Sequence, residues 1–142
     1  MPTASSPVAS RTKLLNGYRA LAGLLAVLVL VQAWMAGHSS TLGYGDLDIT
    51  IHGIVGNVSY LIAVGGLVLT IVARANKATI GVAAAVVVLM TVQIGLGYSG
   101  RDSADAAAWH IPNGVAIFGL AVYQVSQARA LAKGTALTDA RT

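Results

Sequence analysis

The chain alternates between four long apolar blocks and short polar stretches. Each block holds close to the roughly 20 residues that a helix needs to cross about 30 Å of hydrocarbon. A helix also satisfies its own backbone hydrogen bonds within lipid. The pattern therefore predicts a single all-α membrane domain over residues 1–142, with transmembrane helices at about residues 20–37, 49–72, 78–98 and 106–125. Short loops between them predict an up-and-down four-helix bundle, and the two ends of the chain are expected to be short flexible tails.

Composition supports a membrane environment and narrows the possible chemistry. Hydrophobic residues make up 56% of the 142 positions and charged residues only 10%, whereas a soluble domain has about 25% charged residues. The absence of cysteine excludes disulfides, iron–sulfur clusters and thiol catalysis. The chain also has no glutamate, so five aspartates are its only acidic side chains. An electron carrier or a cofactor-binding subunit therefore fits this composition better than a stand-alone enzyme does.

Basic residues gather on one side of the predicted membrane. Only Arg101 lies on the side of the first and third loops, among four aspartates. Because cytoplasmic segments carry the excess of positive charge, both termini are predicted to be cytoplasmic in a multi-pass protein of the cell membrane. This distribution accounts for the net charge of +4 without a nucleic-acid partner. The eight cations on the cytoplasmic side are Arg11, Lys13, Arg19, Arg74, Lys77, Arg129, Lys133 and Arg141.

The two halves of the chain resemble each other. Gln32 lies near the end of the first predicted helix and Gln93 near the end of the third. The second and fourth helices both begin with a His-x-x-x-Gly pattern, at residues 52–56 and 110–114. Polar side chains are rare in these segments, which favours an internal duplication over chance similarity between two Ala-, Val- and Gly-rich stretches. The repeat predicts two helical hairpins related by a twofold axis along the membrane normal.

The three histidines, His38, His52 and His110, all fall at the external ends of the predicted helices. A single histidine is tolerated at a membrane interface, but ionisable groups within transmembrane segments are by default candidates for function. The second and fourth helices of such a bundle are diagonal, so their axes lie roughly 13 Å apart. Two inward imidazoles would leave about 4 Å between their nitrogens, which one iron with two bonds of about 2 Å fills. We therefore expect His52 and His110 to be the axial ligands of a haem.

The neighbouring small residues and amides agree with a haem site. Gly56 and Gly114 follow the histidines by four residues and lie on the same helix faces. They could make room for a flat macrocycle, although small residues also let membrane helices pack closely. Gln32 and Gln93 could donate hydrogen bonds to the haem edge or to a ligand, and structural bonds between helices are an equal alternative.

Two further residues lie near the predicted external surface. Arg101 and His38 could each pair with a haem propionate. Propionates directed outward would meet water, whereas burial among hydrocarbon would cost several kcal/mol. The alternative for both side chains is simple solvation.

At His52, His110 and the repeated glutamine, the chain resembles one half of haem A synthase and a group of small four-helix membrane proteins with the same pattern. The resemblance covers about residues 15–130. It implies haem binding, with His52 and His110 at the positions of the family's paired ligands. The chain has a single bundle, no glutamate to match the essential acid of the synthase and no loop cysteines. Haem A synthesis is therefore not expected of this chain alone.

Three functions follow from these observations. The first is a b-type cytochrome that binds one haem b and exchanges electrons with a respiratory or other redox membrane complex, or with a quinone. The second is a haem-free accessory subunit of a larger membrane complex, which the abundance of glycine and alanine favours. The third is a non-haem metal site built from His38, His52 and His110, with Asp48 as a further candidate ligand, since imidazole suits zinc or copper.

Overall fold

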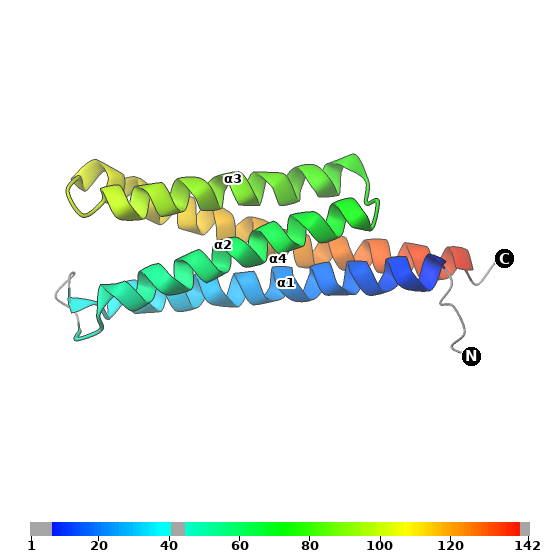
Figure 1. Cartoon of the computed structure of the whole chain (residues 1–142), viewed down its shortest axis with the longest axis horizontal. Coiled ribbons are helices and arrows are strands. Elements are labelled where there is room, and N and C mark those ends of the chain that lie inside the picture. The colour runs from blue at the N-terminus through cyan, green and yellow to red at the C-terminus, as the bar shows by residue number, and fades with distance from the viewer. Residues whose placement is uncertain (1–6, 41–44, 140–142) are drawn as a thin grey trace.

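The computed structural model describes residues 7–40 and 45–139 and contains four helices in this range. In chain order they are α1 (Pro7–Gly37), α2 (Ile49–Val72), α3 (Lys77–Ser99) and α4 (Ala104–Asp139). Each helix is long and apolar enough to cross a membrane. The chain is thus a multi-pass membrane protein, and the predicted four-helix bundle is confirmed (Figure 1).

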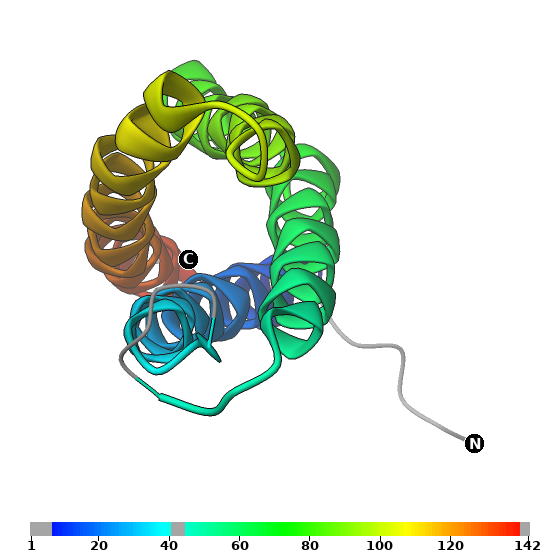
Figure 2. The same ribbon diagram turned by 90° about the vertical axis from the view of Figure 1, so that its left-hand side faces the viewer.

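The helices pack in a ring in the order of the chain. Contacts join α1 to α2, α2 to α3, α3 to α4 and α4 back to α1. Figure 2 views the bundle along its length and shows α2 and α4 on opposite sides of this ring. The predicted diagonal arrangement of the two histidine-bearing helices is therefore confirmed.

The helix ends differ from the prediction on the side of the chain termini. The bounds predicted for α2 are those observed, and α3 is one residue longer at each end. The predicted start of the first helix at Ala20 and the predicted end of the fourth at Val125 are wrong, because α1 begins at Pro7 and α4 continues to Asp139. Figure 1 shows both helices extending past the turn between α2 and α3. Of the flexible tails expected before residue 10 and from residue 134 onward, residues 7–9 and 134–139 are helical, and residues 1–6 and 140–142 lie outside the described residues.

The extension of α1 is helical because it packs against the rest of the bundle. Leu15 and Tyr18 are almost fully buried, although they precede the apolar block. An apolar run in the sequence locates only the part of a helix that faces lipid, so the predicted helix ends where polar residues begin. A helix can continue beyond the membrane wherever one of its faces packs against other helices.

The turn between α2 and α3 is tight and is held by backbone hydrogen bonds. Ala75 N–H donates to the carbonyl of Thr70 at 2.9 Å, and Arg74 N–H donates to Ile71 at 3.0 Å. These two bonds form a Schellman motif, whose left-handed position glycine usually fills. Arg74 occupies that position with a φ of 50°, which costs about 1 kcal/mol relative to glycine. The side chain of Asn76 then caps α3 by accepting from Thr79 N–H at 2.9 Å.

The first turn of α2 is capped by Asp48. Its carboxylate accepts a hydrogen bond from the backbone N–H of Thr50 at 2.8 Å. This bond stabilises the ionised form and lowers the pKa of Asp48. The cap fixes the position at which α2 begins, one turn before His52.

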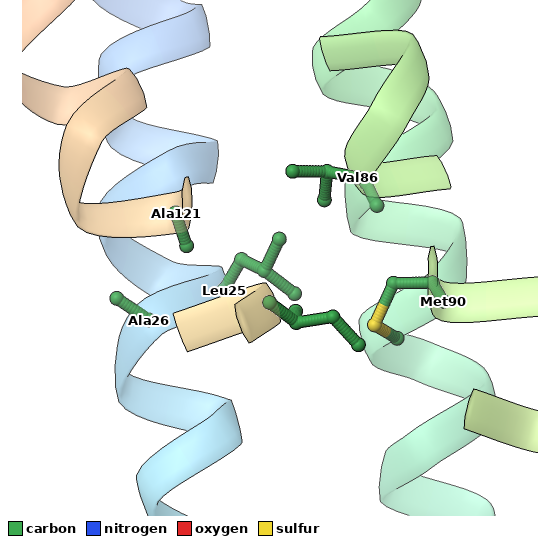
Figure 3. Packing of buried hydrophobic residues seen from close by; sticks show 7 residues of the cluster. Leu25, Ala26, Val86, Met90 and Ala121 are labelled. Carbon is green, nitrogen blue, oxygen red and sulfur yellow. The ribbon is translucent and has the colours of Figure 1, made fainter. Parts of the chain in front are cut away.

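The centre of the bundle is an apolar core. Leu25 of α1, Val86 and Met90 of α3 and Ile117 of α4 are buried there with small residues around them. Figure 3 shows Val86 and Met90 pointing toward Leu25 from the far side of the bundle. A second cluster around Tyr18 continues toward the extensions of α1 and α4 on the side of the chain termini. These layers separate the histidine end of the bundle from its other end.

The buried positions repeat between the two hairpins. His52 of α2 and His110 of α4 are 58 residues apart, and the same offset relates other buried residues of these two helices. Gln32 of α1 and Gln93 of α3 are 61 residues apart, and that offset likewise relates buried residues of α1 and α3. Both members of each pair are buried, so the internal repeat is present in the packing as well as in the sequence. The pairs are Ser59 with Ile117, Ala63 with Ala121, Gly66 with Gln124, Thr70 with Ala128, Tyr18 with Thr79, Ala22 with Ala83, and Leu25 with Val86.

Several of these pairs combine a large residue with a small one. Ser59 in one half corresponds to Ile117 in the other, and Gly66 corresponds to Gln124. Equivalent positions on diagonal helices point toward the same central axis. The space there is limited by close packing, so a large side chain from one half requires a small one from the other.

Candidate functional site

The structure brings His52 and His110 together across the bundle. Their ring centroids are 6.1 Å apart and the ring planes are tilted by 51°. His52 lies in the first turn of α2 and His110 in the second turn of α4, and both are half-buried. The predicted approach of these two rings is therefore confirmed, whereas their role as ligands stays a prediction.

His110 is held by the neighbouring helix α3. Its Nδ1 lies 3.1 Å from the carbonyl oxygen of Gln93. If Gly97 had a side chain, its Cβ would lie 3.1 Å from Cε1 of His110. The glycine thus lets the imidazole lie directly against α3, and the carbonyl fixes which ring nitrogen remains for other contacts. Gly97 was not among the predicted site residues, although its place one turn after Gln93 on the same face was a signal for it.

His52 is held less firmly in the other hairpin. Its ring interacts with the backbone of Gln32, but Nδ1 is buried without a partner in hydrogen-bonding geometry among the described residues. The residue equivalent to Gly97 is Ala36, at the same offset of 61, so a methyl group stands where the other hairpin has none.

The two glutamines tie the helices of each hairpin together. Gln32 Nε2 donates to the backbone carbonyl of His52 at 2.8 Å. On the other side, Asn113 Nδ2 donates to Gln93 Oε1 at 2.6 Å and to the carbonyl of Leu89 at 3.0 Å. These amides therefore form structural bonds between helices in this structure, and their contact with a haem edge or a ligand stays a prediction. Asn113 belongs to this network, and the sequence prediction had left it out of the site.

The glycines after the histidines make room for these amides. A Cβ at Gly56 would lie 3.2 Å from Gln32 Nε2, and a Cβ at Gly114 would lie 3.2 Å from Gln93 Nε2. In this structure glutamine amides lie in the space beside both glycines, and the interpretation that the glycines make room for a flat macrocycle stays a prediction. The parallel distances show that the repeat extends to the contacts around each histidine.

His38 and Arg101 lie at the same end of the bundle but contact other groups. His38 is exposed, with Nδ1 3.0 Å from the carbonyl of Trp34 and its ring stacked 4.6 Å from that indole. The guanidinium carbon of Arg101 lies 5.2 Å from the centre of the Tyr98 ring. Neither side chain is part of the His52–His110 pair.

The predicted non-haem metal site is not assembled. Among the residues that the structure describes, no group of three or more His, Cys, Asp or Glu side chains could hold a metal ion. His38 is engaged with Trp34, and Asp48 is engaged as the cap of α2. Two imidazoles remain as the donor set.

Comparisons of the chain with protein-family models, with curated proteins and with solved structures find no match. The function is therefore argued from the paired histidines and from the helices that position them.

Proposed function

We propose that the protein is a membrane-bound b-type cytochrome with one haem b held between His52 and His110. The single observation that supports this most strongly is the distance of 6.1 Å between the two ring centroids. An iron with metal–nitrogen bonds of about 2 Å on each side separates two imidazole centres by about 6 Å. Rings on diagonal helices reach this distance only when both turn into the bundle.

The chain's own residues would orient the ligands. The carbonyl of Gln93 accepts a hydrogen bond from Nδ1 of His110, which leaves Nε2 as the ligating nitrogen and fixes the orientation of the ring. Below the pair, Met90 and Ile117 form part of the buried apolar core and exclude water. When bound, the haem supplies one-electron transfer, and two histidine ligands leave no open iron position for a substrate.

The proposed orientation places this site near the external face. Both termini and the α2–α3 turn would be cytoplasmic, because they carry eight of the nine basic residues. The remaining cation, Arg101, and His38 lie at the histidine end, where they could meet propionates directed outward. The electron partner would be a redox membrane complex or a quinone that reaches the same face.

A haem-free accessory subunit is the second candidate. The observation that favours it is that glutamine amides occupy the space beside Gly56 and Gly114. Side chains of the chain itself therefore fill the space that a haem would need at these positions. Haem binding would require these amides to turn aside or to border the macrocycle.

Purification from cells supplied with iron and haem precursor separates the two candidates. The cytochrome proposal expects one haem per chain and the absorption spectrum of a low-spin, six-coordinate iron. His38→Ala is the matched control and should keep that spectrum, because His38 lies outside the pair. Protein that is folded, as judged by circular dichroism, and carries no haem would establish the accessory-subunit alternative instead.

A further inference from the structure

A groove lies at the end of the bundle opposite the histidines. It encloses about 460 Å³ between the first turns of α1 and the turn that follows α2. None of the described residues that line it is acidic. They are Ser10, Arg11, Leu14, Val72, Ala73 and Arg74.

Two arginines give the groove its charge. Arg11 Nε donates to the carbonyl of Ala73 at 3.1 Å, which joins α1 to the end of α2 and fixes the guanidinium at the groove wall. Arg74 reaches the same groove from the turn. Guanidinium groups present several N–H donors in a plane and bind phosphate oxygens in pairs. Two guanidinium groups that line one groove suit a phosphate group.

The backbone at Arg74 gives independent evidence that its side chain matters. The residue sits at the left-handed position of the Schellman motif with a φ of 50°, where glycine is the favoured residue. A side chain kept in such a conformation indicates a role beyond the turn itself.

The apolar wall of the groove distinguishes a lipid from a soluble phosphate. Leu14 and Val72 line it beside the arginines, and Val72 is the last residue of the membrane-spanning helix α2 with 58% of its surface exposed. The groove therefore opens where the membrane core meets the headgroup layer. Basic pockets between helices at this depth bind anionic headgroups, with acyl chains along the adjoining apolar surface.

We propose that the groove binds one anionic phospholipid, with its phosphate between Arg11 and Arg74 and its acyl chains along Leu14 and Val72. The site is separate from the histidine pair and does not depend on haem. Such a lipid would join α1 to the α2–α3 turn.

Native mass spectrometry of the full-length protein with phosphatidylglycerol or phosphatidylcholine tests the lipid directly. Wild type should retain one phosphatidylglycerol in preference to phosphatidylcholine. The double variant Arg11→Gln, Arg74→Gly should lose this preference by roughly thirtyfold, because each interfacial cation contributes a factor of about five. The control Arg129→Gln, Lys133→Gln also removes two cations, but from exposed positions of α4 outside the groove, and it should retain the lipid. Equal losses in both double variants would show general charge attraction and overturn the proposal.

Two further measurements exclude misfolding of the variant and binding of a soluble phosphate as explanations of the result. Arg74→Gly alone relieves the backbone, so without lipid it should melt above wild type. Added phosphatidylglycerol should raise the melting temperature of wild type more than that of this variant, which keeps Arg11, and an equal rise in both would contradict the proposal. Glycerol phosphate should not displace the lipid; if it does, the groove binds a soluble phosphate and the lipid assignment is wrong.

Discussion

The α1–α2 and α3–α4 hairpins share one plan but hold their histidines differently. Both place a glutamine on the first helix, and a histidine and a glycine on the second. In the α3–α4 hairpin the imidazole of His110 contacts the backbone carbonyl of Gln93 at 3.1 Å. In the α1–α2 hairpin, Nδ1 of His52 is buried without a hydrogen-bond partner among the described residues. The comparison shows that two similar hairpins can bring their histidines together while only one of the two imidazoles is hydrogen bonded to its neighbouring helix.

Two substitutions between the halves account for the difference. Gly97 leaves space for the His110 ring, whereas the equivalent position in the first hairpin is Ala36, which carries a methyl group. Asn113 connects Gln93 to α4 through its amide, whereas its equivalent is Val55, which has no polar group. We infer that His110 is the anchored member of the pair and His52 the adaptable one.

The largest expected effect comes from removing either histidine. His110→Ala should abolish haem binding, because the anchored ligand contributes most of the affinity, with a loss of more than about 100-fold. His52→Ala should retain some haem in a five-coordinate, high-spin form. The ratio of haem to protein and the optical spectrum of the two variants measure this order. Retention of more haem by His110→Ala than by His52→Ala would reverse the assignment.

Gly97→Ala should make the second hairpin resemble the first. The new methyl group would lie 3.1 Å from Cε1 of His110, so the ring must move away from the Gln93 carbonyl. Haem affinity should fall by about 10- to 100-fold, as for other losses of an orienting contact. Gly95→Ala is the matched control on the same helix, because a Cβ there meets nothing within 4 Å. Haem titration of the two variants should therefore differ, and equal affinities would contradict the role given to Gly97.

Asn113→Val introduces the residue that the first hairpin carries. It removes the bonds to Leu89 and Gln93 Oε1, and the free energy of unfolding should fall by about 1 kcal/mol. Asn57→Val provides a control, since Asn57 is exposed on α2 and its loss should leave stability unchanged. Thermal unfolding in one detergent measures both. A stability of Asn113→Val equal to that of wild type would show that this network adds nothing to the second hairpin.

The smallest effect is expected for Ala36→Gly, which gives the first hairpin the residue of the second. The His52 ring could then approach the Gln32 carbonyl, and its displacement from iron by added imidazole should slow a few-fold. The gain is small because glycine in a helix costs about 1 kcal/mol relative to alanine. Stopped-flow mixing with imidazole records the rate. Faster displacement than in wild type would show that the methyl group supports His52.

The sequence predicted those features that depend on apolar runs and on helix order. The bounds of α2 follow from an apolar block that a capping aspartate precedes. The proximity of His52 and His110 follows from two diagonal helices with equivalent residues. The extension of α1 could not be predicted in this way, because burial of Leu15 depends on contacts with other helices. The same limit explains Gly56 and Gly114: spacing places them on the face of the histidines, but the rotation of the neighbouring helix decides that a glutamine fills the space.

The large–small pairs in the interior bear on how such a chain could arise. In a symmetric dimer of identical hairpins, each residue near the twofold axis faces the same residue of the other copy. Two copies of the first hairpin would bring Ser59 against its own copy and leave a void, whereas two copies of the second would crowd Ile117 and Gln124 against theirs. Fusion into one polypeptide lifts this restriction, since each half can then change against a partner that differs from it. Neither present hairpin could therefore rebuild the bundle by self-association, and descent from a symmetric ancestor would have required compensating changes on both sides of the axis.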